Sequence, residues 1–140
     1  MLRVNSPGGS AYGSEQIWYA VNQLKKEKPV IVSMGDYAAS GGYYISCNAD
    51  TIVAEPTTLT GSIGIFGMMP NAKGLTEKLG VNFDVVKTNP YADFANLIPP
   101  MHDGELAMTQ KYVNNRDELS LSRSSEGRGN AMEELVKIAQ

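Results

Sequence analysis

One segment constrains the fold most: the β-branched run Val30–Ser33, followed a few residues later by the small-residue turn Ala38–Gly42. Such a run is typical of a strand buried on both faces. Further strands are predicted at Leu2–Asn5, Thr51–Ala54, Ser62–Phe66 and Phe83–Lys87, and helices at 11–26, 40–47, 72–79, 103–126 and from 130. Gly35–Ala39 is predicted to be a tight loop and Glu55–Gly61 a turn. Because strands alternate with helices, the sequence predicts an α/β fold with largely parallel strands.

Composition excludes several classes of protein. The net charge is −3 without an extended Lys/Arg cluster, so nucleic acid is not an expected partner. The single cysteine, Cys47, excludes an internal disulfide and a multi-cysteine metal site, and neither metal nor cofactor is expected. No apolar run approaches the roughly 18–20 residues of a membrane span. Residues 1–140 are predicted to form a single domain, and both ends read as cut, which suggests a piece of a longer protein.

The first glycine-rich segment, Asn5–Ser10, joins a predicted strand to a helix. One interpretation is a simple turn in which glycine supplies a positive φ. The other is that Gly8 and Gly9 expose backbone N–H groups that bind a developing oxyanion. The segment has neither the Gly-x-Gly-x-x-Gly fingerprint of dinucleotide-binding proteins nor the Gly-Lys-Ser/Thr of a phosphate-binding loop.

The second segment places Ser40 between Ala38-Ala39 and Gly41-Gly42, after a buried strand and at the start of a helix. A serine there commonly serves as an N-cap. Alternatively, it is a nucleophile, since small neighbours leave room for a substrate carbonyl and a helix start favours negative charge. The N–H of Gly41 would then be the second oxyanion donor, beside that of Gly8.

The third segment, Leu59–Gly64, reads as a turn that feeds a strand, and its Ser62 is a candidate for orienting a base. A base for Ser40 is harder to find. His102, in a proline-rich loop, would be needed for a Ser-His-Asp triad. Lys87 and Lys73 are the candidates for a serine–lysine dyad. Cys47 reads as a small buried hydrophobe.

Taken together, the motifs Arg3–Ser10, Val32–Ser46 and Leu59–Gly67 resemble the signal peptide peptidase A (protease IV) family. The resemblance implies a Clp/crotonase-like fold of repeated β-β-α units with a C-terminal helical segment. It implies a Ser–Lys dyad endopeptidase that degrades cleaved signal peptides at the bacterial membrane, with its catalytic part outside the cytoplasm and this chain itself soluble. It assigns the nucleophile to Ser40 and oxyanion support to Gly8 and Gly9. Together with the residues considered above, the predicted oxyanion hole consists of Gly8 and Gly41, with Gly9 and Ser62 as candidate support. Peptides are the implied substrates, and a homo-oligomer is the implied assembly.

The lysine does not map simply onto this sequence. In short members of the family it follows the strand predicted here at Phe83–Lys87, where this chain has Ala92. Long members are tandem duplications in which the N-terminal half gives the lysine and the C-terminal half the serine. The resemblance therefore implies the C-terminal half of a long member, with the N-terminal half as its partner and the isolated chain inactive.

Two other functions are compatible with the sequence. Crotonase-like units also serve as non-catalytic assembly or scaffold modules, because a fold alone does not fix a function. A relative of acyl-CoA hydratases would share the oxyanion chemistry, but Asp36 is the one acidic residue close to the glycine-rich segments. Retention of Ser40 between small residues favours the peptidase over the scaffold.

Overall fold

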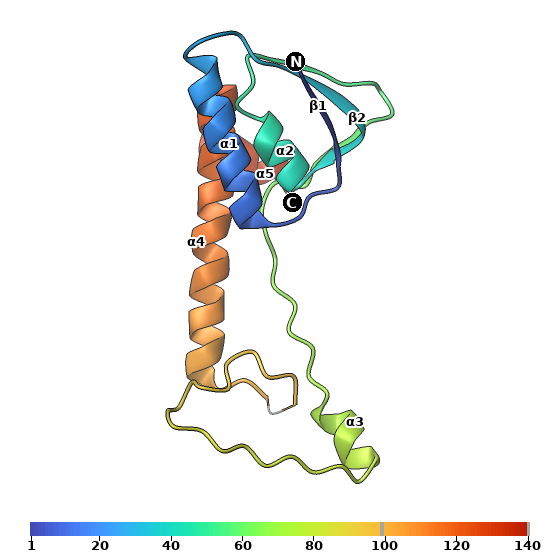
Figure 1. The fold of residues 1–140 in the computed structure, drawn as a ribbon, viewed down its shortest axis with the longest axis vertical. Coiled ribbons are helices and arrows are strands. Elements are labelled where there is room, and N and C mark those ends of the chain that lie inside the picture. The colour runs from blue at the N-terminus through green and yellow to red at the C-terminus, as the bar shows by residue number, and fades with distance from the viewer. Residues whose placement is uncertain (99, 140) are drawn as a thin grey trace. The chain divides into compact units, whose positions relative to one another are not determined.

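The computed structural model describes residues 1–98 and 100–139 (Figure 1). Two compact units are distinguished within it. The first comprises Met1–Ile65 and Arg116–Gln140, and the second Phe66–Asn115. The first unit contains the sheet.

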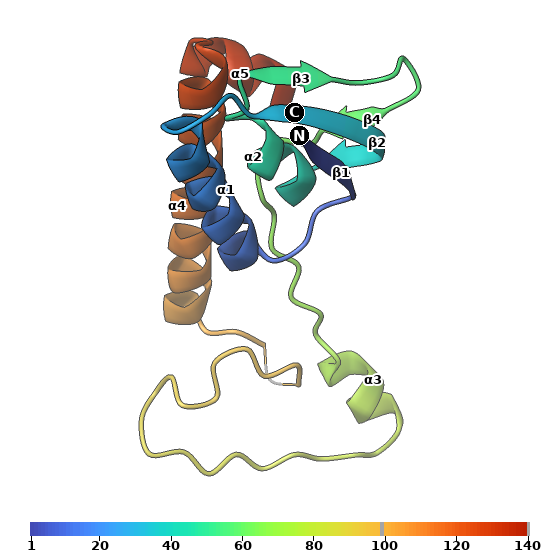
Figure 2. The same cartoon turned by 45° about the horizontal axis from the view of Figure 1, so that its top comes forward.

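A parallel sheet is built around its longest strand, β2 (Ile31–Ala39), as Figure 2 shows. One edge of β2 pairs with β1 (Leu2–Ser6). Along the other edge, its first half pairs with β3 (Thr51–Val53) and its last residues pair with β4 (Leu59–Gly61). All these pairings are parallel, which confirms the α/β prediction.

The helices of the first unit lie between its strands or after them in the sequence. The first unit has α1 (Ala11–Lys25), α2 (Gly41–Ser46), the C-terminal part of α4 (Asp103–Arg128) and α5 (Met132–Ala139). Ser10 caps α1, since its Oγ accepts the Gly13 N–H at 3.2 Å. The short α3 (Lys73–Lys78) belongs to the second unit. A core between sheet and helices contains the buried side chains Val4, Val21, Val30, Val32, Met34, Ala38 and Ala49.

The predicted loop at Gly35–Ala39 is wrong, because these residues form the second half of β2. The reason is tertiary pairing. A register shift between Val4 and Ser6 places the Asn5 side chain against β2, where its Oδ1 accepts the Tyr37 N–H at 3.0 Å. A Cβ on Gly35 would lie 2.8 Å from the Asn5 side chain, so the glycine is there for close packing and not for a turn.

Four further segments differ from the sequence predictions. Leu59–Gly61 is a strand within the predicted turn, because it finds a partner in β2. Ser62–Phe66 and Phe83–Lys87 are not strands, and neither pairs with a strand in the part of the chain that the structure describes. A strand needs a partner for its backbone hydrogen bonds, which no local pattern guarantees. Helix α4 also continues through Gly127 to Arg128 instead of ending at about Glu126.

Close packing joins α2 to the C-terminal part of α4 and explains Gly127. A Cβ on this residue would overlap the carbonyl oxygen of Cys47. Cys47 is fully buried, as predicted, with its Sγ 3.1 Å from the Tyr44 carbonyl oxygen, and burial raises the pKa of its thiol to about 11. Among the helices of residues 1–98 and 100–139, none combines the length and apolar character needed to cross a bilayer.

Gly127→Ala is expected to destabilise the first unit by about 1–3 kcal/mol, the usual cost of overpacking. The added methyl group would collide with backbone, which cannot rotate away as a side chain can. Urea unfolding followed by circular dichroism measures the effect. Gly74→Ala in α3 is the matched control, because no atom lies within 4 Å of the added Cβ and alanine is the better helix former. A loss no greater than that of the control would contradict this packing.

Candidate active site

The turn between β2 and α2 holds Ser40 in a conformation that L-residues rarely adopt. Its φ is 51° and its ψ is −118°, and its side chain makes no capping hydrogen bond to α2. The backbone is held from both sides: the Ser40 N–H donates to the Gly61 carbonyl at 2.9 Å, and the Ser40 carbonyl accepts the Tyr44 N–H at 2.9 Å. The N-cap interpretation of Ser40 is therefore wrong, and its hydroxyl is left available.

Glycines bring the Asn5–Ser10 segment into direct contact with this turn. A Cβ on Gly8, whose φ is +119°, would lie 2.8 Å from the Ser40 Cβ and 3.2 Å from its Oγ. A Cβ on Gly42 would overlap the Ser6 carbonyl oxygen. The two glycine-rich motifs, which are far apart in the sequence, thus form one site. Gly8 and Gly42 are needed there because a Cβ at either position would overlap the facing segment.

Three backbone N–H groups lie close to Ser40, and they differ in what they bind. The Gly8 N–H donates to the Ser6 Oγ at 3.2 Å. The N–H groups of Gly9 and Gly41 donate to no acceptor in the described part of the chain. They lie near each other, since a Cβ on Gly41 would be 3.3 Å from the Gly9 nitrogen. Two unused donors beside a serine hydroxyl are the arrangement that a developing oxyanion requires.

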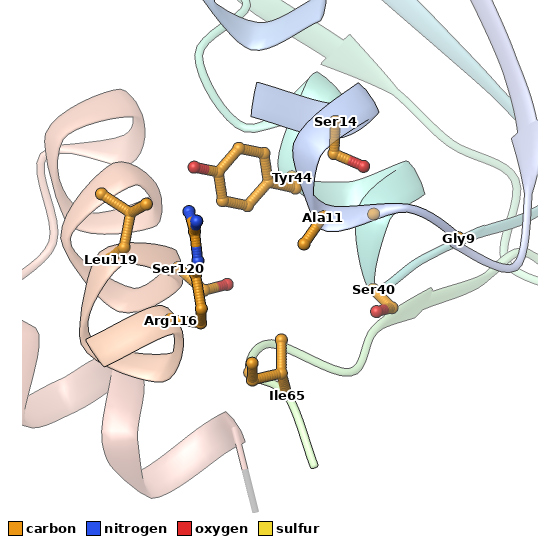
Figure 3. Close-up of a pocket in the computed structure, with 11 residues that line it drawn as sticks. Gly9, Ala11, Ser14, Ser40, Tyr44, Ile65, Arg116, Leu119 and Ser120 are labelled. Atoms are coloured by element: carbon orange, nitrogen blue, oxygen red, sulfur yellow. The ribbon is translucent and has the colours of Figure 1, made fainter. Parts of the chain in front are cut away.

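A pocket of about 50 Å³ opens beside Ser40 (Figure 3). Figure 3 shows side chains of α4 on one side, facing those of α1, α2 and the Ser40 turn on the other. The Ile65 N–H donates to Asp117 Oδ1 at 3.2 Å, which holds that part of the wall against α4. The residues lining the pocket are Gly9, Ala11, Ser14, Ser40, Gly41, Tyr44, Gly64, Ile65, Arg116, Leu119 and Ser120.

Sequence reasoning missed most of this wall. Ala11 and Ser14 are three residues apart on α1, and Arg116, Leu119 and Ser120 have helical spacing on α4. That spacing shows that each set shares a helix face. It does not show that the two faces meet at Ser40, because their approach depends on tertiary packing.

Ser62 directly follows β4, beside the Gly61 carbonyl that accepts the Ser40 N–H. It is exposed, its φ is 51°, and its hydroxyl has no hydrogen-bond partner among the described residues. A role for Ser62 in orienting a base therefore remains a prediction.

The basic groups considered from the sequence lie in the second unit. Lys87 Nζ pairs with Asp93 Oδ1 at 2.9 Å and donates to the Pro90 carbonyl at 3.2 Å. The hydrogen bond from Lys87 holds the pKa of the Asp93 carboxyl below its usual value. His102 uses its backbone N–H to bind Glu105, at 2.8 Å. Ala92 lies exposed in a turn of the same segment.

Comparison with known proteins gives a consistent set of similarities. The model of peptidase family S49 matches residues 22–140. The whole chain is 44% identical to Protease 4 of Haemophilus influenzae and 35% identical to the chloroplastic serine protease SPPA of Arabidopsis thaliana. Over 97% of its length, it is 37% identical to a putative signal peptide peptidase SppA of Enterococcus faecium.

These relatives are all longer than the chain. It spans 23% of the Haemophilus protein, 21% of the Arabidopsis protein and 41% of the Enterococcus protein. The similarity therefore describes one segment of each relative and not its full length.

Backbone strain at Ser40 gives a stability prediction. Ser40→Gly is expected to be more stable than Ser40→Ala by about 1 kcal/mol, because only glycine adopts this positive φ without a steric penalty. Urea midpoints of the two variants measure the difference. Ser122, within α4, is the matched position, and there the alanine variant is expected to be the more stable by about 1 kcal/mol. The same ranking at both positions would show that Ser40 is not strained.

Proposed function

Because the chain belongs to peptidase family S49, we propose that it is the serine-bearing domain of an endopeptidase, with Ser40 as the nucleophile. One observation carries this proposal. Ser40 adopts a strained φ of 51° while its hydroxyl neither caps α2 nor bonds elsewhere in the described residues. Strained residues of this kind cluster at functional sites, where the surrounding structure holds them in place. A scaffold module has no need of such a residue.

The proposed reaction begins with attack by the Ser40 Oγ on the carbonyl carbon of a peptide bond. The new O–C bond forms as a neutral amine accepts the hydroxyl proton and the carbonyl oxygen takes the electron pair. When the oxyanion collapses, the C–N bond breaks and the leaving amine receives that proton. Water then attacks the acyl-enzyme by the same route, which releases the acid and restores Ser40.

The oxyanion hole is proposed to consist of the Gly41 N–H and an N–H of the Gly8–Gly9 loop. Gly41 is adjacent to Ser40, and the Gly9 N–H is the unused donor of the loop. Gly8 lies in contact with the Ser40 side chain, but its N–H is directed to the Ser6 hydroxyl at 3.2 Å. We therefore assign the second donor to Gly9 in the geometry described here, and to Gly8 a packing role beside it.

The base is proposed to come from outside this chain. The matching position of single-domain members is Ala92, which cannot accept a proton. The nearest lysine in that segment, Lys87, binds Asp93 Oδ1 and the Pro90 carbonyl, so its ammonium group is held by partners of its own segment. The 23% coverage of the Haemophilus relative leaves ample chain for a second, lysine-bearing domain.

The substrates are proposed to be peptides that include remnants of cleaved signal peptides. This part of the proposal rests on the resemblance and on the Enterococcus relative, whose name is putative signal peptide peptidase SppA. Action at the bacterial membrane and assembly as a homo-oligomer belong to the same proposal. The pocket beside Ser40 would receive a substrate side chain next to the scissile bond.

Ser40→Ala in the full-length enzyme is expected to lower peptide hydrolysis by about 10³-fold or more, the effect of removing a catalytic nucleophile. A fluorogenic peptide assay measures the rate. A serine-directed fluorophosphonate, followed by peptide mass spectrometry, should label Ser40 and spare Ser62. Turnover within a few-fold of wild type would exclude Ser40 as the nucleophile.

The chain alone is expected to be nearly inactive, because serine is a weak nucleophile without a neighbouring base. Addition of the lysine-bearing part should restore hydrolysis, and a single lysine-to-alanine change in that part should abolish it again. Lys87→Ala should leave the restored rate within about twofold. Activity of the chain alone that depends on Lys87 or His102 would refute an external base.

A further inference from the structure

The two proposed oxyanion donors belong to different elements of the fold. Gly9 immediately precedes the N-cap of α1, and Gly41 is the first residue of α2. The distance between their N–H groups therefore depends on how α1 packs against α2. The two helices are in close contact at the site itself, where a Cβ on Gly41 would lie 2.6 Å from the Ser14 Oγ.

A polar contact one residue further along α1 ties the same two helices together. The Tyr44 hydroxyl on α2 donates to Glu15 Oε2 on α1. Tyr44 lies one helical turn after Ser40, and its N–H binds the Ser40 carbonyl at 2.9 Å. Its ring also lines the pocket, facing the side chains of α4 in Figure 3. Tyr44 thus links Glu15 to the turn at Ser40.

The other oxygen of the Glu15 carboxylate is fixed by α4. Arg123 Nη2 binds Glu15 Oε1 at 3.0 Å, and the guanidinium lies 3.9 Å above the ring of the buried Trp18. Only about a quarter of each side chain of this ion pair is exposed, so solvent screens it less than a surface pair. Burial and then Glu15 raise the pKa of Tyr44, so its phenol remains a donor across the physiological range.

We propose that Glu15 is a positioning residue for the oxyanion hole, which holds α2 and the Gly9 end of α1 at the separation that brings the Gly9 and Gly41 N–H groups together. The inference rests on the proposed function, because it concerns the same oxyanion. Glu15 does not touch the substrate. It acts through Tyr44 on one side, and it is itself oriented by Arg123 on the other.

A purely structural role would make the same contacts but would affect only stability. A positioning role has a different kinetic consequence. Displacement of one oxyanion donor weakens binding of the transition state, and it leaves ground-state binding of the peptide nearly unchanged. The effect should therefore be on kcat and on the affinity for a tetrahedral analogue, with little change in KM.

The test uses the full-length enzyme with Glu15→Gln and Tyr44→Phe, and Glu126→Gln as the matched control. Glu126 also pairs with Arg123, at 3.3 Å, but it is exposed and does not contact Tyr44. Both test variants are expected to lower kcat about tenfold with KM within about twofold. The oxyanion donors would still be present, but displacement from their catalytic positions would slow the reaction. They should weaken binding of a peptide boronic acid by the same factor. The control should change neither quantity by more than about twofold.

The outcomes separate this inference from the proposed function. Absence of Ser40-dependent turnover in the wild-type enzyme would overturn the proposed function, and this inference with it. Wild-type turnover with unchanged kcat and boronate affinity in both variants would overturn the positioning role alone. If Glu15→Gln does not fold, Tyr44→Phe decides, because it keeps the ring in the pocket and removes only the hydroxyl. A lower urea midpoint with unchanged kcat would show that the contacts of Glu15 and Tyr44 have a structural role only.

Discussion

Backbone contact between the Gly8–Gly9 loop and the turn at Ser40 is the constraint on which the site depends. The loop ends β1, the turn ends β2, and parallel pairing brings both to the same edge of the sheet. Side chains larger than hydrogen would separate them, as the contacts of a Cβ on Gly8 or Gly42 show. Interiors are packed too closely for such overlaps to relax cheaply. These glycines are therefore required for the close approach of the two segments, independently of any part in the chemistry.

The strained backbone of Ser40 is maintained by ordinary interactions around it. Its N–H is bound by β4 and its carbonyl by α2, so the residue cannot relax without breaking both hydrogen bonds. β4 is in turn fixed on β2, where the Thr60 Oγ1 donates to the Ala38 carbonyl at 2.9 Å. The short strand β4 thus acquires a role, since it holds the turn at Ser40 in place.

The second unit shows where local sequence patterns are insufficient. Phe83–Lys87 has the composition of a strand, and so has Ser62–Phe66, which runs from the first unit into the second. Neither pairs with another strand within residues 1–98 and 100–139, and Phe66 and Val86 are 87% and 97% exposed. Strand formation depends on a partner and not on the segment alone, whereas helix bonds are local. Consequently α1, α2 and α3 were predicted within a few residues, while two of the predicted strands were wrong.

The sequence by itself determined the alternation of strands and helices, the parallel sheet, the family and the small residues around Ser40. These properties depend on composition and spacing along the chain, which are directly readable. Only the tertiary structure decided that Ser40 is not a cap, that Gly9 has the unused N–H of its loop, and that Glu15 reaches Tyr44. Each of these depends on backbone torsion angles or on the approach of distant segments. Such features arise when the elements pack against one another, so no pattern within a single segment contains them.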